Sequence, residues 1–266
     1  MKKIIQALLI CCCLLFASCT YTGENKAQVI DENNSGSTAY GENMTVSRAL
    51  AAKMICCLFL DDTKPSQNNF FDVAEDMWYF DYANIVFENN IMVGNNGYFK
   101  PLEPITYLEA MKVIKRIGGE EVDYDSKNGN MPISYTLWCS MVEDTLEKKE
   151  KNVEYSEISI FATGNGEASD EMTAVTDKGI YGYCGLWLES CKDKKIKAYI
   201  LDDEIVFISD IVSEEGTFEG ANITTENDFV WAELLGVKRK FSCILIDIKH
   251  GECGIITKNG EVIDIF

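Results

Sequence analysis

Histidine is nearly absent from this sequence, since His250 is the only one among 266 residues. One histidine cannot build a multi-histidine zinc site, and triad chemistry would depend on that residue alone. His250 precedes a glycine and lies three residues from Cys253, which favours a solvated turn over a catalytic dyad. The commonest catalytic side chain therefore gives no support to an enzyme.

Positive charge is also scarce. The chain has 24 Lys and Arg against 43 Asp and Glu, and its formal net charge is −19. Such a surface repels phosphate groups, so we expect no nucleic-acid partner. Hydrophobic residues make up 47% of the chain, which is enough for a folded core and excludes global disorder.

The eleven cysteines include no pair with CxxC spacing. Four of them lie within the first 19 residues, and the seven that remain are an odd number. This pattern argues against a metal ribbon and against a complete disulfide framework. Cys56 and Cys57 lie in an apolar stretch, where small core side chains are the favoured interpretation. We expect no metal site and no cofactor.

No apolar run near the N-terminus reaches the ~20 residues that a membrane-spanning helix needs. A shorter apolar run over residues 4–16 follows Lys2-Lys3 and ends at Ala17-Ser18-Cys19, the layout of a signal peptide at residues 1–18. Residues 16–19 resemble the lipobox of bacterial lipoproteins, with Phe in place of the usual Leu. The resemblance implies that Cys19 becomes a diacylated N-terminus anchored on the extracellular face of the membrane. A plain secretory signal is the alternative.

Residues 19–44 are rich in Asn, Gly, Ser, Glu and Thr, a composition typical of a flexible tether. The pattern changes at Met44. Thr45 or Ser47 can cap a first helix, whose apolar positions recur at helical spacing: Leu50, Met54, Ile55, Leu58 and Phe59.

Three further features follow in the helical region. A second helix carries Trp78, Tyr79, Tyr82, Ile85 and Val86 on one face and ends at Asn89-Asn90. A tight turn comes next, in which Gly94 and Gly97 are expected to supply positive φ angles. Thr106 then starts a third helix as its N-cap, with Glu109 as the capping-box partner.

The order of motifs over residues 70–117 resembles the S-layer homology (SLH) module. The residues that carry the resemblance are Phe70-Phe71-Asp72-Val73, Trp78, the glycine turn through Pro101, and Ile105-Thr106 with Glu109. Residues 45–59 resemble the second helix of a preceding repeat, so the SLH-like helical module spans residues 45–119. Members of this family hold secreted proteins on pyruvylated polysaccharide of the Gram-positive cell wall.

The SLH resemblance implies a polysaccharide-binding groove that contains Arg48, Trp78 and Glu109. Tyr107 stands where the second repeat should have Arg, which leaves Arg48 as the well-placed cation for a sugar carboxylate. Binding is therefore expected to be weak and to run through Arg48 beside Trp78. In the alternative interpretation Trp78 is a core residue, Glu109 is only part of a cap, and the module is a degenerate folding unit.

A different periodicity begins after a Gly-, Glu-, Asp- and Asn-rich boundary at residues 118–130. Residues 123–129 lack the ligand pattern of a calcium loop, and residues 163–166 lack that of a phosphate loop. A helix is expected over residues 133–149, with its buried face formed by Leu137, Trp138, Met141, Val142 and Leu146.

From Tyr155 onward the hydrophobic period is mostly two. Strands are expected at residues 157–162, 172–176, 179–183, 196–201, 204–208, 241–248, 254–257 and 261–265. Tight connections are expected at Asp202-Asp203, His250-Gly251 and Asn259-Gly260. The fold class is therefore α+β: a small helical module, then a mainly antiparallel β domain at residues 131–266 that contains one amphipathic helix. We expect a small sheet or partial barrel that folds without the helical module.

A weaker resemblance concerns this second half. Segments within residues 176–206 and 258–265 look like the noncatalytic β region of clostridial sporulation stage II protein D and amidase-enhancer proteins. The resemblance implies similar surroundings and does not extend to an activity. Adjacent carboxylates recur along the chain, but nothing in their spacing shows the ~5–10 Å arrangement across a cleft that a glycosidase needs.

Three functions remain open at this stage. The favoured one is a noncatalytic cell-envelope lipoprotein that binds cell-wall polysaccharide or peptidoglycan, with the membrane contacted through its lipid. The second is an accessory partner or degenerate relative of a peptidoglycan-remodelling hydrolase. The third is a cryptic hydrolase, which the sequence disfavours.

Overall fold

The computed structural model describes residues 41, 43–60, 64–119, 129–164, 172–226, 229–243 and 250–266. The expected signal peptide, Cys19 and nearly all of the tether lie outside these residues, as does most of the expected boundary at 118–130. Residues Thr38–Phe266 form one compact unit. Within the described ranges, none of the helices has both the length and the apolar character needed to cross a membrane.

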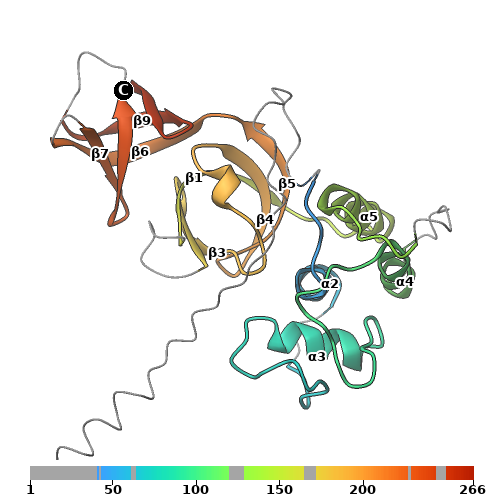
Figure 1. Ribbon diagram of the computed structural model, residues 1–266. Helices are drawn as coiled ribbons and strands as arrows, with labels where there is room; N and C mark the ends of the chain where they lie inside the picture. The colour runs from blue at the N-terminus through green and yellow to red at the C-terminus, as the bar shows by residue number, and fades with distance from the viewer. Residues whose placement is uncertain are drawn as a thin grey trace, which may run out of the picture. The chain divides into compact units, whose positions relative to one another are not determined.

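Four α-helices lie in the first half of the described chain (Figure 1). They are α2 (Arg48–Phe59), α3 (Phe80–Glu88), α4 (Tyr107–Arg116) and α5 (Tyr135–Lys148). The caps of α2 and α4 are confirmed: the Ser47 hydroxyl accepts from the Leu50 amide, and Thr106 forms the capping box with Glu109. Ser134 caps α5 in the same way, so this helix begins two residues later than expected.

The three segments that precede α2, α4 and α5 pair with one another. Bridges join Thr45 to Ser134, Ser47 to Pro104, and Thr106 to Pro132, which closes a ring of three short extended segments. Each segment ends in a Ser or Thr cap, so the N-termini of three helices converge on this ring. Helix α5 is therefore part of the helical layer, although the sequence grouped it with the β domain.

The second half forms two closed barrels of five strands each (Figure 1). The first barrel has the order β1-β2-β3-β5-β4, and its strands are β1 (Tyr155–Thr163), β2 (Thr173–Thr176), β3 (Gly179–Gly182), β4 (Lys195–Leu201) and β5 (Glu204–Ser213). A short 3-10 helix, η1 (Glu189–Cys191), precedes β4. The second barrel has the order β10-β8-β7-β6-β9, and its strands are β6 (Gly216–Glu226), β7 (Phe229–Leu234), β8 (Val237–Cys243), β9 (Gly251–Lys258) and β10 (Glu261–Ile265).

The α+β class and the mainly antiparallel pairing are confirmed, but the expectation of one small sheet or partial barrel is wrong. Only the β3–β5 and β8–β10 pairs of the described strands are parallel. Strands β6 and β7 were not expected. The outward positions of β6 are largely polar, whereas those of β7 include Phe229 and Trp231, and Gly220, at a φ of +70°, interrupts β6 beside a register shift. The hydrophobic alternation is therefore broken in the middle of that strand.

Three smaller expectations also fail. Leu137 is 39% exposed and not part of the buried face of α5, because that helix turns its other apolar residues inward. Gly94 does not have a positive φ, whereas Gly97 does, at +81°. Gly94 is needed for close packing instead, since a Cβ there would lie 2.4 Å from the Tyr98 carbonyl oxygen. The expected strand 241–248 begins earlier, at Val237, and residues 244–249 lie outside the described chain.

Two hydrophobic clusters hold these layers together. The larger cluster contains buried residues of all four helices and of the first barrel, and the smaller one combines the interior of the second barrel with Phe161, Ala162 and Val175 of the first. The Trp138 indole of α5 donates to the Met54 sulfur of α2 at 3.2 Å. The Tyr135 hydroxyl, also on α5, donates to the Ile208 carbonyl of β5. This shared core argues against the expectation that residues 131–266 fold without the helical module.

Candidate polysaccharide-binding site

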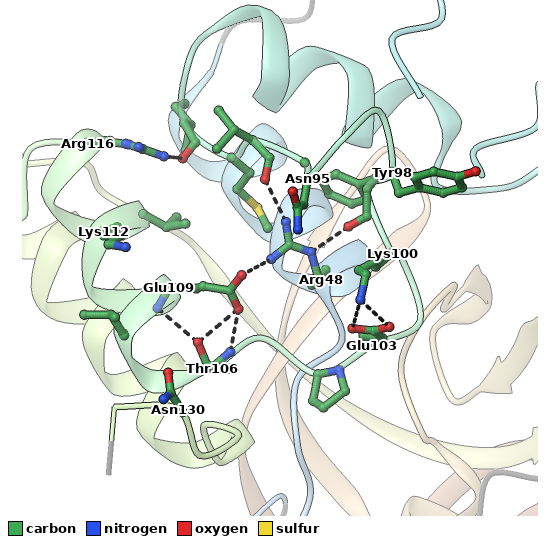
Figure 2. A pocket seen from close by; sticks show the side chains of 18 residues that line it. Arg48, Asn95, Tyr98, Lys100, Glu103, Thr106, Glu109, Lys112, Arg116 and Asn130 are labelled. Carbon is green, nitrogen blue, oxygen red and sulfur yellow. Dashed lines mark hydrogen bonds and ion pairs between the residues drawn. The ribbon is translucent and has the colours of Figure 1, made fainter. Parts of the chain in front are cut away.

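A pocket of about 470 Å³ lies between the start of α2, the loop over residues 91–104 and helix α4 (Figure 2). Arg48 and Glu109, two of the three expected site residues, line it. The sequence spacing of Arg48 and Glu109 is 61 residues, and the ring of capped segments brings their helix N-termini together. The other residues that line the pocket are Ile91, Met92, Val93, Gly94, Asn95, Tyr98, Phe99, Lys100, Glu103, Pro104, Thr106, Leu108, Lys112, Val113, Arg116 and Asn130.

The Arg48 guanidinium connects three parts of the pocket wall through hydrogen bonds. It donates to the Phe99 carbonyl at 2.7 Å, to the Val93 carbonyl at 3.1 Å and to Glu109 Oε1 at 2.7 Å, as Figure 2 shows. It also lies 5.1 Å from the centre of the Phe99 ring. Arg48 is only 6% exposed, so most of its donors already serve the fold. Its first role is to hold the pocket open in one shape.

Glu109 has two functions at once. Its Oε2 accepts from the Thr106 amide and hydroxyl, both at 3.0 Å, which completes the capping box of α4. Its Oε1 accepts from Arg48. The side chain of Glu109 is 41% exposed, so its carboxylate is both a structural cap and a wall of the pocket.

Asp72 positions the far side of the pocket. Its carboxylate accepts from the Phe99 amide at 2.8 Å and from the Lys100 amide at 2.7 Å. Lys100 has a φ of +61°, a left-handed conformation that the Asp72 carboxylate helps to fix. The sequence contained this aspartate within the Phe-x-Asp-Val motif, but its role in holding the loop was not deduced from the motif alone.

The charge of the pocket is opposite to that of the chain. Its walls carry four cations, Arg48, Lys100, Lys112 and Arg116, against the two carboxylates of Glu103 and Glu109. Lys100 pairs with Glu103 at 2.9 Å, and Arg116 donates to the Ile91 carbonyl at 2.8 Å. Lys112 is exposed and has no ion-pair partner in the part of the chain that the structure describes. The sequence interpretation, which relied on Arg48 as the cation, missed the other three.

Trp78 does not lie at this pocket, which corrects the expectation that it stands beside Arg48. It is half-buried and packs against Tyr79 and Tyr82, with ring centroids 5.3 and 6.4 Å away. A Cβ added to Gly185 of the β3–η1 segment would lie 2.6 Å from the Trp78 ring. Trp78 precedes α3 and is drawn toward the first barrel, a packing partner that the helical motif does not reveal.

The helices α4 and α5 place tyrosines where α2 places Arg48. Tyr107 and Tyr135 are the first helical residues after their caps, as Arg48 is after Ser47. Tyr135 is buried, and its hydroxyl accepts from the Ile208 amide at 2.8 Å, so the first barrel covers that helix start. Within the described residues, Arg48 is the cation at these three positions.

Metal-binding clusters and thiols are two further kinds of chemical group to consider among the described residues. These residues hold no group of three His, Cys, Asp or Glu side chains that could bind a metal ion. Burial raises the pKa of Cys139 to about 12, and burial likewise raises the pKa of Cys191 to about 12. Such thiols stay protonated near neutral pH and are poor nucleophiles. Cys56 is buried in the core and Cys57 packs partly against it, as expected for small apolar side chains.

Comparison with known proteins gives one match. Residues 69–111 match the family model of the S-layer homology domain, a range that includes α3, the pocket loop and the first turn of α4. No curated protein and no solved structure gives a significant match, so the resemblance of the second half to sporulation proteins has no support. The match confirms the S-layer homology interpretation for this stretch and supports a cell-wall or cell-surface association of the protein.

Proposed function

We propose that this protein is a noncatalytic cell-envelope protein that binds an anionic cell-wall polysaccharide in the pocket between α2 and α4. One observation carries the proposal: four cations face two carboxylates in a pocket of a chain whose net charge is −19. An acidic glycan is repelled by the rest of the surface and needs such a local concentration of donors. A pyruvyl carboxylate suits these donors, since charge-assisted hydrogen bonds to carboxylates are among the strong ones.

The binding is expected to be weak, because a single pocket gives no avidity. Tyr107 and Tyr135 stand at the other two helix starts, and the second is covered by β5. A lipid at Cys19 would supply the missing proximity by holding the protein on the membrane beneath the wall. The lipoprotein-type signal before Cys19 is the feature that favours this anchor.

The noncatalytic part of the proposal keeps the expectation drawn from the sequence, in which His250 is the only histidine. The buried thiols of Cys139 and Cys191, whose pKa values burial raises, are poor candidates for a nucleophile. The alternative role as an accessory partner of a peptidoglycan-remodelling hydrolase rests on the weaker resemblance alone. No feature of the two barrels favours it.

Cosedimentation with purified Gram-positive walls tests the pocket. The parent should sediment with intact walls and lose this retention when the walls are stripped of their secondary polysaccharide. Lys112→Gln removes an exposed pocket cation that forms no ion pair within the described fold, so it should weaken retention about tenfold or more. Lys238→Gln on β8 removes the same charge from the second barrel and should change retention little. Equal retention of parent and Lys112→Gln at several salt concentrations would contradict the proposal.

The lipid anchor has its own test. Cys19→Ala should leave the chain unprocessed or release it into the medium, because the acylated residue is missing. Membrane fractionation and the mass of the N-terminal peptide measure this. Unchanged membrane partition together with unchanged mass would exclude the anchor and leave the pocket proposal untouched.

A further inference from the structure

Two aromatic rings stand exposed beside the pocket. Phe71 is 82% exposed and Tyr98 is 48% exposed. Their ring centroids are 5.7 Å apart, with an angle of 60° between the planes. A single exposed apolar side chain is ordinary, but two adjacent aromatic rings in solvent are the kind of surface that marks a binding site.

The core does not need Phe71. Its neighbour Phe70 is 5% exposed and packs against Phe87 and Phe99, each with a ring centroid 5.1 Å away. Phe70 therefore satisfies the apolar requirement of this segment. Phe71, in contrast, leaves most of its surface open to solvent.

The loop nevertheless holds the Phe71 ring in a defined place. The Phe71 amide donates to the Gly97 carbonyl at 2.8 Å. A Cβ added to Gly97 would lie 2.5 Å from the Phe71 ring, so only glycine lets the ring rest on the backbone there. Asn95 and Tyr98 exchange backbone hydrogen bonds of 2.9 and 3.0 Å, which fixes the turn that carries the second ring. Both rings are thus preorganised, which lowers the entropic cost of binding.

The position of the pair relative to the pocket indicates what it meets. Tyr98 belongs to the pocket wall. In Figure 2 its ring is directed away from Arg48, on the outer side of the loop beyond Asn95. A chain molecule that leaves the pocket past Asn95 would meet this ring pair.

We propose that Phe71 and Tyr98 form a stacking subsite for a neutral sugar ring of the polysaccharide whose acidic group occupies the pocket. The inference rests on the proposed function and adds a second point of recognition to it. A pyranose has an apolar C–H face and a polar rim, so it can cover the negatively polarised face of an aromatic ring while its hydroxyl groups stay hydrated. Asn95 and Lys100 lie beside the rings and are polar groups within the same wall.

This arrangement assigns different tasks to the two parts of the site. The cations select for negative charge and give a salt-dependent contribution, whereas the aromatic pair contributes contact that salt does not screen. A polysaccharide should therefore retain part of its affinity at high salt. A small acidic sugar that fills only the pocket should lose nearly all of it.

The test compares variants at Phe71, Tyr98, Lys112 and Phe229, with wall polysaccharide released from peptidoglycan as a soluble probe. Phe71→Ala should weaken binding about fivefold to tenfold, and Phe71→Trp should restore it, because contributions of aromatic contacts fall in this range. The indole of Phe71→Trp should also change its fluorescence when the probe is added. Phe229→Ala, which removes a 41% exposed ring from β7 of the second barrel, is the matched control and should bind as the parent does. Thermal unfolding checks that all variants are folded.

The outcomes separate the two proposals. If Lys112→Gln loses binding while Phe71→Ala and Tyr98→Ala bind as the parent does, the stacking subsite is wrong and the pocket stands. If the parent does not bind the probe at all, both proposals fail. If Phe71→Ala instead abolishes a concentration-dependent dimer seen by analytical ultracentrifugation, the rings serve contact between two copies and the sugar subsite is wrong. Loss of binding in Phe71→Ala with recovery in Phe71→Trp supports the subsite.

Discussion

Helix α2 carries two buried cations whose surroundings differ. Arg48, in its first turn, lies at the edge of an open pocket and pairs with Glu109, which is 41% exposed. Lys53, five residues later, has a fully buried side chain and forms an ion pair with Glu204 of β5. Lys53 also donates to the Cys184 carbonyl at 2.9 Å and the Ile205 carbonyl at 3.0 Å. The first pair borders solvent that a ligand can replace, and the second is closed off by the first barrel.

The difference shows that charge type alone does not reveal function. All donors of the Lys53 ammonium are directed at protein oxygens, so it can offer nothing to a ligand. The pocket around Arg48 keeps an exposed cation, Lys112, on the same surface. We therefore assign the Lys53 pair to the cohesion of the helices with the barrel, and the Arg48 pair to the shape of the binding site.

The largest expected effect on stability comes from removing the helices that precede residue 131, including α2. A fragment of residues 131–266 retains both barrels and α5 but lacks α2, so Trp138 loses its contact with Met54 and the apolar side of the first barrel is exposed. It also leaves the Glu204 carboxylate without Lys53. We expect the fragment to aggregate or to unfold without cooperativity, measured by circular dichroism in urea against residues 38–266. A sharp cooperative transition in the fragment would restore the independent β domain that the sequence suggested.

The next largest effect is expected at Lys53. Lys53→Met removes the ammonium but keeps much of the side-chain volume, and it leaves a largely buried carboxylate and two carbonyls without their donor. Loss of one partner of a buried ion pair costs about 3–5 kcal/mol of unfolding free energy. Lys258→Met breaks a pair on the second barrel that is 44% exposed on both sides, and it should cost less than about 1 kcal/mol.

Urea denaturation of the two variants measures this contrast. The double variant Lys53→Met/Glu204→Gln should recover part of the lost stability, because the unpaired charge is gone. A Lys53→Met protein as stable as the Lys258→Met control would show that the buried pair contributes no cohesion. Wall retention of the folded Lys53→Met protein should match the parent, since Lys53 does not line the pocket.

Substitutions at Arg48 and Glu109 are expected to lower stability less and to affect wall binding as well. Arg48→Ala removes three hydrogen bonds and should cost about 2–3 kcal/mol of unfolding free energy. It should also abolish measurable wall binding, because the 91–104 loop loses its tie to α4. Glu109→Ala should cost about 1–2 kcal/mol through the lost capping box and ion pair, with a smaller effect on binding.

Stability and wall retention measured on the same samples separate these roles. Glu109→Gln keeps an acceptor for the Thr106 amide but loses the charge, so it should retain most of the cap. If Arg48→Ala binds walls as the parent does, the pocket is not the site. If Glu109→Ala abolishes binding without a loss of stability, Glu109 contacts the ligand directly.

The sequence predicted local structure better than long-range packing. The caps at Ser47 and Thr106, the end of α3 at Asn89-Asn90 and the turn at Asp202-Asp203 were all correct, because each depends on residues a few positions apart. Ser134 was not recognised as the third member of the ring, since its bridge to Thr45 spans almost the whole helical region.

The candidate site shows the same limit. Arg48 and Glu109 were found because a family motif marks them, and the structure brings them to 2.7 Å. Trp78 was placed wrongly, because its packing against Gly185 depends on how the first barrel docks. Lys100, Lys112 and Arg116 have no motif of their own. Only the path of the 91–104 loop over α4 shows that they share a wall.

The smallest expected effect on stability concerns two buried thiols, which are closed off from solvent as Lys53 is. Burial raises the pKa of Cys139 and that of Cys191 to about 12, from an ordinary value of 9.0. Because the pKa is raised in the folded state, the contribution of these thiols to stability is fully present below pH 9. This contribution is lost as the pH rises above 9, because the unfolded chain then releases protons that the folded chain retains.

By pH 10 each thiol should reduce the unfolding free energy by about 1.4 kcal/mol, while stability between pH 6 and 8 should be unaffected. Urea unfolding at pH 8, 9 and 10 measures the slope, and Cys191→Ala should make it shallower by one thiol. If Cys191→Ala leaves the slope between pH 9 and 10 unchanged, that thiol does not stay protonated in the folded protein, and the barrel interior beside η1 is open to solvent.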